Sequence, residues 1–258
     1  MEACCLKFGM AYIPQIESLI LVLKTFLPYV EASEKVLADI SGGMQMSKII
    51  GIMGESGSGK TTAMRNLPPD KTVYIDADRK GLSWKGWKSQ YNSEQKNYFR
   101  IDDPSRVLEC LKWVQESALQ CEYIVIDTIN GIMVGDEMRR MKEKNYDKWV
   151  ELAQSIWSIL DYANNMDDKY TVIVIAHSET FIDDNGYVFT RIRTSGRKLS
   201  KIVLESKMTT VLLAKAKNGN YVFETKANSS TAKSPMGAFD KAEIENDIML
   251  VIEALKDY

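Results

Sequence analysis

The sequence predicts an α/β fold, in which a mainly parallel sheet is flanked by helices and extended by antiparallel hairpin strands near the C-terminus. Three observations indicate this class. Short β-rich runs alternate with segments of helical periodicity. Two of the runs, residues 122–128 and 170–178, are continuously apolar, which is typical of strands buried on both faces of a parallel sheet. Beyond residue 180, two Asn-Gly pairs each separate two β-rich runs and indicate hairpins.

The individual elements follow from these patterns in chain order. Strands are expected over residues 47–53, 72–77, 97–101, 122–128 and 170–178. Helices are expected from Lys60 onward, over 103–119 with Ser105 near the N-cap, over 146–165 and over 241–255. Hairpins are expected over 180–196 around Asn185-Gly186 and over 209–226 around Asn218-Gly219, because Asn-Gly accepts the positive φ of a tight primed turn.

We interpret residues 1–45 as a helical extension, which could be dispensable, ahead of a domain that spans residues 46–258. The segment Ile16–Val30 has apolar residues at helical spacing, and the pair Gly42-Gly43 marks the boundary. The same segment contains charged residues and a proline and is too short to cross a membrane, so no membrane partner is expected. The helix would pack on the core or on a neighbouring subunit.

The composition excludes some classes of function. The chain has 258 residues, of which 45% are hydrophobic and 26% are charged, and its formal net charge is -2. This balance argues against a protein that coats nucleic acid by bulk charge, so any such contact would need local basic patches. The four cysteines show no metal-ligand spacing and indicate reduced thiols in a cytoplasmic setting.

A glycine-rich loop follows the first predicted strand. Gly54, Gly59, Lys60 and Thr61 satisfy the pattern G-x-x-x-x-G-K-[ST] between an apolar strand and an expected helix. Glycines let successive backbone amides point inward as a nest for anions, and the start of a helix adds a positive dipole. Lys60 would reach the β- and γ-phosphates of ATP, and the Thr61 hydroxyl would be a ligand of Mg²⁺. The residues expected to contact the nucleotide here are Gly54, Glu55, Ser56, Gly57, Ser58, Gly59, Lys60, Thr61 and Thr62.

Acidic residues end two of the other predicted strands. Asp127 ends the apolar run at 122–128 and would hold a magnesium-bound water, with Thr128 beside it. Asp76 and Asp78 end the second strand, where a carboxylate could polarise the water that attacks the γ-phosphate. The plainer interpretation is that these acids cap strand ends and turns.

The segments "YIDAD" and "TVIVIAHSE" resemble those of the RecA-like P-loop ATPases. The resemblance implies that Asp78 is the catalytic base, although the family has Glu there, one methylene longer. It implies that His177, where RecA has Gln, is a neutral sensor of the γ-phosphate; a structural histidine is the alternative. It also implies that Lys226 and Lys233, in a late loop, reach the ATP of a neighbouring subunit; both could equally be solvated surface lysines.

These motifs lie between residues 48 and 239. Their order is similar to that in compact phage-encoded AAA-family ATPases, some of which anneal single-stranded DNA during recombination. The resemblance implies a homo-oligomer, a ring or a filament, with ATP between subunits, in the cytoplasm of a bacterial host if the protein is phage-encoded.

Two segments are candidates for contact with single-stranded DNA, because they follow the strands whose loops grip DNA in RecA-like proteins. Basic side chains would pair with phosphates and aromatic rings would stack on bases. The candidates are Arg139, Arg140 and Lys142 in the first segment, and Tyr187, Phe189, Arg191, Arg193, Arg197 and Lys198 in the second. The alternative is that both segments are solvated surface.

The sequence therefore predicts an ATPase that uses ATP and Mg²⁺ to control its binding to single-stranded DNA. Two alternatives remain at this point. A nucleotide kinase would need an arginine-rich lid, which residues 191–197 could imitate. A switch that binds ATP without hydrolysing it would use the same phosphate loop.

Overall fold

The computed structural model describes residues 47–118, 120–144, 147–182, 185–195 and 202–258, which all lie in the unit Met46–Tyr258. Their strands form one nine-stranded sheet in the order β3-β2-β4-β5-β1-β7-β8-β9, and β6 pairs with β5. The predicted extension over residues 1–45, together with Arg197 and Lys198, lies outside the described residues.

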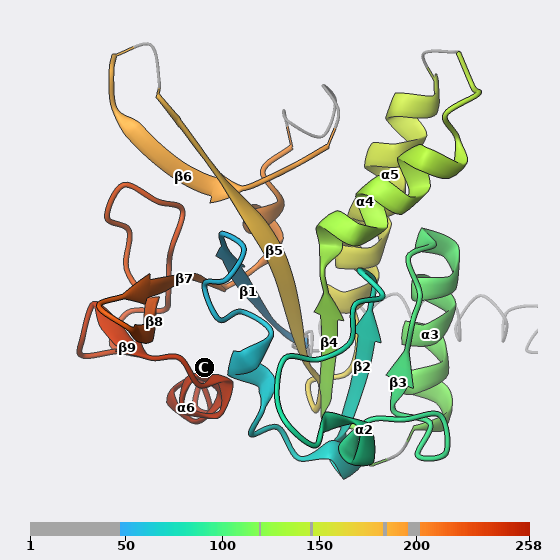
Figure 1. The fold of residues 1–258 in the computed structure, drawn as a ribbon, viewed down its shortest axis with the longest axis horizontal. Helices are drawn as coiled ribbons and strands as arrows, with labels where there is room; N and C mark the ends of the chain where they lie inside the picture. Colours follow the sequence, from blue (N-terminus) through green and yellow to red (C-terminus); the bar gives the residue numbers. More distant parts are fainter. Residues whose placement is uncertain (1–46, 119, 145–146, 183–184, 196–201) are drawn as a thin grey trace, which may run out of the picture. The chain divides into compact units, whose positions relative to one another are not determined.

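The parallel part of the sheet contains the strands that lead to the phosphate loop and the acidic residues (Figure 1). Its strands are β1 (Lys48–Gly54), β2 (Thr72–Asp76), β3 (Tyr98–Phe99), β4 (Tyr123–Asp127), β5 (Thr171–Ile182) and β7 (Thr210–Lys217). β5 lies between β1 and β4, and Gly54 is in register with His177. The carboxyl ends of these strands therefore meet at one edge of the sheet, where α/β proteins place their ligands.

Antiparallel strands extend this core. β6 (Val188–Ile192) pairs with the second half of β5, β8 (Asn220–Glu224) pairs with β7, and β9 (Glu243–Glu245) pairs with β8. The predicted fold class is confirmed: the sheet is mainly parallel, has helices on its faces and gains antiparallel strands toward the C-terminus.

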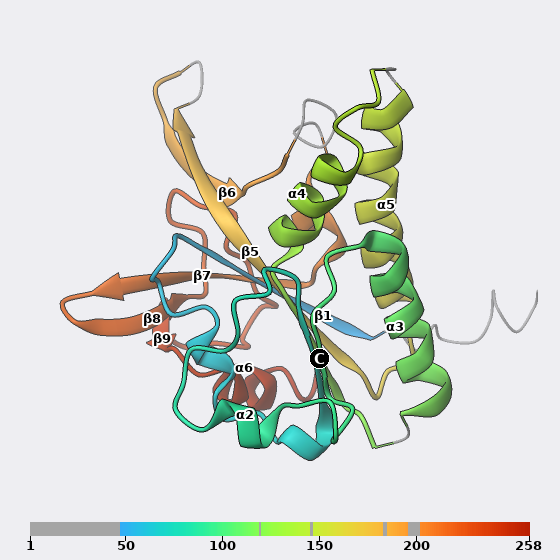
Figure 2. The same ribbon diagram turned by 45° about the vertical axis from the view of Figure 1, so that its right-hand side comes forward.

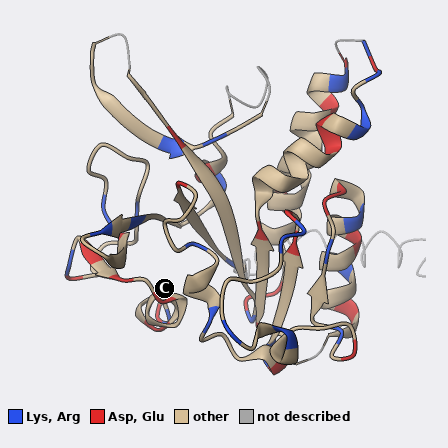
Figure 3. Ribbon diagram, in the orientation of Figure 1, with Lys and Arg blue, Asp and Glu red and all other residues tan. Residues whose placement is uncertain are grey.

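Helices cover both faces of the sheet (Figure 2). Alternate residues of the central strands enter two separate apolar cores. Ile49 and Met53 of β1 face α3 (Pro104–Ser117), α4 (Ile129–Arg139) and α5 (Asp147–Asn164). Ile50 and Ile52 face the side that carries α2 (Trp87–Gln90) and α6 (Ile248–Ala254). Charged residues lie mainly on helices and loops, and the central strands carry few (Figure 3).

Two sequence predictions of helices need correction. The helix expected from Lys60 is only a 3-10 turn, Thr62–Met64, because Pro68 and Pro69 follow and disfavour a helical residue before them. The helix expected over 241–255 is reduced to α6, which Asp247 caps by accepting from the Met249 amide; the residues before it form β9. The helix expected over 103–119 is confirmed as α3: its N-cap is Asp103, and Ser105, two residues further on, donates its amide to that carboxylate.

Both predicted hairpins are present. Lys217 pairs with Asn220, and Asn218 and Gly219 have φ of 52° and 79°, so this tight turn is confirmed. In the other hairpin the last described pair is Ile182 with Val188, and Gly186 has a φ of 84°; the predicted turn at Asn185-Gly186 lies partly outside the described residues. α4 was not predicted, since its Asn and two Gly residues weaken the helical pattern.

In the described part of the chain, no helix is long and apolar enough to span a membrane.

Candidate functional site

The phosphate loop follows β1 at the carboxyl edge of the sheet. Gly57 and Gly59 have φ of 80° and 90°, a region that L side chains rarely adopt. Within the described residues, the backbone amides of Gly57, Gly59, Lys60 and Thr61 donate no hydrogen bond to the chain. Four amide donors thus remain for an anion, which is the condition for a nest.

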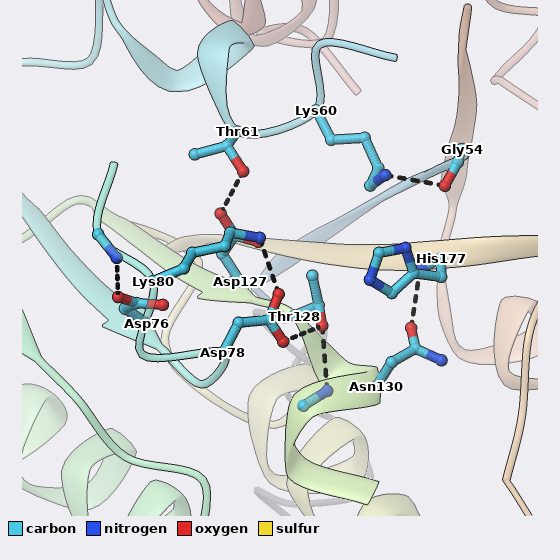
Figure 4. Close-up of polar contacts among 12 residues, drawn as sticks. Gly54, Lys60, Thr61, Asp76, Asp78, Lys80, Asp127, Thr128, Asn130 and His177 are labelled. Carbon is cyan, nitrogen blue, oxygen red and sulfur yellow. Dashed lines mark hydrogen bonds and ion pairs between the residues drawn. The ribbon is translucent and has the colours of Figure 1, made fainter. Parts of the chain in front are cut away.

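Lys60 folds back over this loop (Figure 4). Its Nζ donates to the carbonyl oxygens of Gly54 at 2.8 Å and Glu55 at 2.7 Å. Burial lowers the pKa of the Lys60 ammonium to about 8, although the Asp127 carboxylate opposes this effect. The ammonium is therefore held by two neutral carbonyls in a cleft where an anionic ligand would be a stronger partner.

Thr61 and Asp127 are 66 residues apart in sequence, and the sheet brings them into contact. Thr61 Oγ1 donates to Asp127 Oδ2 at 2.7 Å, and the buried Tyr74 hydroxyl donates to the same oxygen at 2.8 Å. Asp127 is 1% exposed, and its Oδ1 has no hydrogen-bond partner. A hydroxyl beside a carboxylate with one oxygen left over is the ligand chemistry that Mg²⁺ prefers, so these residues fit the ion.

Asp76 and Asp78 have different surroundings, although both follow β2. Asp76 is buried and accepts from the Gly81 amide at 2.8 Å and from the Tyr98 hydroxyl at 2.5 Å. Asp78 Oδ1 accepts from the Thr128 hydroxyl at 2.9 Å, which places this carboxylate at the start of α4 beside the Asp127 strand end. Asp76 thus fixes the loop after β2, and Asp78 is the acid that faces the site.

His177 ends the part of β5 that pairs with β1. Its backbone amide donates to Asn130 Oδ1 at 2.7 Å, and the imidazole is half-buried. Burial, and then the nearby Lys60 ammonium, lower the pKa of His177 below 6.5, so the ring is neutral at pH 7. A neutral imidazole can donate a hydrogen bond to a phosphate oxygen, as the sequence analysis expects of a sensor.

These groups surround a cleft of about 310 Å³, whose lining includes Gly59, Lys60, Thr61, Lys80, His177 and Tyr221. A second cleft of about 580 Å³ shares Thr62 and Tyr221 with it and adds Arg65 and Asn246. The Asn246 side chain is buried, and its Nδ2 has no hydrogen-bond partner. The two clefts therefore adjoin at Thr62 and Tyr221.

Sequence reasoning missed several residues of the site, namely Tyr74, Lys80, Tyr221, Asn246 and Asn130. Lys80 left a signal, because a cation two residues after an acid at a strand end reaches the same edge of the sheet. The others come from a strand interior, a hairpin, the connection between β9 and α6, and a helix, which the sequence does not link to the loop.

Lys226 and Lys233 do not line the cleft of their own chain. Both side chains are exposed in the segment between β8 and β9, and Lys233 forms a backbone bridge with Val211.

The first DNA-contact candidates are engaged within the chain. Arg139 ends α4 and pairs with Asp102 at 3.2 Å and Asp103 at 3.5 Å. Arg140 pairs with Glu143 at 2.7 Å and also with Glu151. Neutralised guanidinium groups have less to offer to phosphates, so the structure weakens the case for these two residues. Lys142 is exposed.

The second set of candidates lies on the β5–β6 hairpin, which projects beyond the sheet (Figure 1). Phe189 faces Phe181 across the strands with ring centroids 5.7 Å apart. Arg191 stacks on the Phe181 ring at 4.7 Å and pairs with Glu179 at 2.8 Å. Tyr187 is 72% exposed, and the backbone amide of Arg193 donates to the His177 carbonyl.

Among solved structures the chain is similar to the flagellar accessory protein FlaH from Methanocaldococcus jannaschii, at 16% sequence identity and a TM-score of 0.41 over 81% of this chain and 88% of that one. No curated protein sequence matches. Residues 46–236 match a family described as an AAA domain, which includes the phosphate loop, Asp78, Asp127 and His177. The chain therefore belongs to this AAA domain family.

Proposed function

We propose that the protein binds ATP with Mg²⁺ at the phosphate loop, hydrolyses it, and uses the cycle to control its binding to single-stranded DNA during annealing or recombination. The observation that carries the ATPase part is the contact of Thr61 with Asp127 beside four free loop amides. Mg²⁺ bound there would supply charge neutralisation for the phosphates.

The residues around this contact have the roles that hydrolysis needs. Asp78 would accept the proton of the attacking water while the bond between the γ-phosphorus and the ADP oxygen breaks. The Thr128 hydroxyl holds its carboxylate in place. Lys60 would move from the loop carbonyls to the phosphates, and neutral His177 would donate to a phosphate oxygen.

The nucleoside would occupy the adjoining cleft. Tyr221 borders both clefts and offers a ring for stacking on a base, and the partnerless Asn246 amide is a hydrogen-bonding group beside it. An amide of this kind reads the edge of a base by donating and accepting.

The link to DNA rests on β5, since one strand carries both the sensor and the hairpin. His177 lines the nucleotide cleft, and five residues further on β5 ends at Ile182. The hairpin offers the aromatic rings of Phe181 and Phe189, which suit stacking on unpaired bases. Arg191 beside them would have to exchange its Glu179 carboxylate for a DNA phosphate. Exposed Lys226 and Lys233 would reach ATP bound by a neighbouring copy.

The test is ATP turnover with Mg²⁺, measured with and without a single-stranded oligonucleotide. We expect turnover in the wild type, stimulation by the oligonucleotide, and loss of both in Lys60→Ala. DNA affinity should also fall steeply as salt rises. Phosphate transfer to a nucleoside would favour the kinase, and tight ATP binding without turnover would favour the switch. Turnover unaffected by DNA would refute the DNA part alone.

A further inference from the structure

Lys80 lies between the two carboxylates of the site (Figure 4). Its Nζ is 2.7 Å from Asp78 Oδ2 and 3.5 Å from Asp127 Oδ1. Among the described residues, Lys80 is the one cation within ion-pair distance of Asp127. The ammonium therefore bridges the acid that fits the role of base and the acid that fits the role of metal ligand.

Asp127 needs such a cation. Its side chain is 1% exposed, and Oδ1 is the oxygen that receives no hydrogen bond. A buried carboxylate without a counter-charge is costly, because it has lost its hydration. The Lys80 ammonium reduces this cost from the open side of the cleft, where its own side chain is 43% exposed.

The position of Lys80 is set by its loop. Arg79 and Gly81 on either side of it have φ of 56° and 83°. The Gly81 amide donates to Asp76 Oδ2 at 2.8 Å, so the backbone after β2 turns back toward the sheet edge. Lysine suits an exchangeable contact, since it is a point charge on a flexible stem and does not form the two-pronged pair of an arginine.

We propose that Lys80 is a positioning residue that holds the cation position between Asp78 and Asp127 until Mg²⁺ takes it, and that it then pairs with the terminal phosphate of ATP. The second step is supported by the cleft, because Lys80 lines it together with Gly59, Lys60 and Thr61. This inference rests on the proposed function for its nucleotide step. The exchange with Mg²⁺ does not depend on hydrolysis.

The exchange is tested on the full chain without nucleotide, with Mg²⁺ alone as the probe. Melting temperatures are measured from EDTA to millimolar Mg²⁺ for the wild type, Lys80→Ala and Lys80→Met, with Lys85→Ala as the matched control. Lys85 is exposed on the same loop and lies outside the lining of the cleft. Removing the competing ammonium should lower the melting temperature in EDTA and lower the Mg²⁺ midpoint by about tenfold. A midpoint equal to that of the wild type in both Lys80 variants would overturn the exchange.

The phosphate contact is tested by nucleotide affinity at saturating Mg²⁺, measured by displacement of a fluorescent ATP analogue. Lys80→Ala should weaken ATP by about tenfold and leave ADP unchanged, because only ATP carries the terminal phosphate. Equal losses for ATP and ADP, or none, would overturn this step. A wild type that binds ATP without turnover would refute the proposed hydrolysis, and the Mg²⁺ melts would still decide the exchange.

Discussion

Thr61 Oγ1 donates a hydrogen bond of 2.7 Å to Oδ2 of Asp127, so the loop after β1 and the end of β4 are joined by one short contact. Thr61→Val removes the hydroxyl and keeps the shape of the side chain. We expect it to destabilise the protein by about 1–3 kcal/mol, since a hydrogen bond to a buried charged group is lost. The Mg²⁺ concentration needed for half-maximal nucleotide binding should also rise. Thr61→Ser keeps the hydroxyl and is the control for both the chemical denaturation and the Mg²⁺ titration; equal behaviour of the two variants would contradict the role.

Asp78→Asn should keep nucleotide binding and reduce turnover by about 100-fold or more, because an amide cannot accept the proton of the attacking water. Binding is measured with a fluorescent ATP analogue and turnover by phosphate release. Asp70→Asn, on the exposed turn Pro69–Lys71, is the control. Wild-type turnover in Asp78→Asn would dismiss Asp78 as the base and leave the phosphate loop unaffected.

Gly131 is the third residue of α4 and packs against the Asp78 loop. A Cβ added there would lie 2.5 Å from Asp78 Oδ1 and 2.9 Å from the carbonyl carbon of Ala77. Because backbone atoms cannot move aside cheaply, Gly131→Ala should destabilise the protein by about 1–3 kcal/mol and lower turnover. Val134→Ala, at an exposed position of the same helix, should change neither. A free energy of unfolding equal to that of the wild type in Gly131→Ala would show that the Ala77–Asp78 backbone moves to accommodate the methyl group.

The pKa of His177 is lowered from 6.5 by burial and by Lys60. As pH falls below 6.5, the unfolded chain takes up a proton at this residue before the folded chain does, so the free energy of unfolding decreases. Above that pH both states are neutral and there is no effect. His177→Gln removes this contribution, so its stability should fall less than that of the wild type between pH 7 and pH 5.5 in urea titrations. Parallel profiles of unfolding free energy against pH in the two proteins would contradict the lowered pKa of His177.

Cys110 and Cys121 are buried, and burial raises the pKa of their thiols to about 12 and about 11. The reactive thiolate is therefore scarce at pH 8 in the folded protein. We expect iodoacetamide to leave both residues unmodified at pH 8 and to label them in urea, as read by peptide mass spectrometry. Labelling of either one without denaturant would show that its segment opens.

The sequence predicts the core of this fold well, because β4 and the first half of β5 are apolar runs typical of strands buried on both faces of a parallel sheet. It also predicts the contact of Thr61 with Asp127, since both follow parallel strands that end at one edge. The turns and short helices are less accessible. The 3-10 turn at Thr62 is short because two prolines follow it, and β9 forms because β8 has an edge with which it can pair. Helical periodicity in the sequence reports neither cause.

The set of site residues that the sequence predicts is incomplete for a related reason. Tyr74 reaches Asp127 from the interior of a strand, where it reads as an ordinary core residue. Arg139 and Arg140 read as a basic surface in the sequence, whereas their carboxylate partners come from the residues just before α3, from the loop after α4 and from α5. Charge pairing across elements depends on packing, which a linear pattern does not contain.

β5 pairs with β1 and β4 on its two edges from Thr171 to Ile175, and in the described part of the chain its outer half, Ser178–Ile182, pairs with β6. β6 is held in turn from its other side, because the Thr190 amide donates to the Ser229 carbonyl and the Thr190 carbonyl accepts from the Thr231 amide. A tilt of β5 at the histidine would therefore pass through β6 to the segment at residues 229–231 as well as to the outer end of the hairpin.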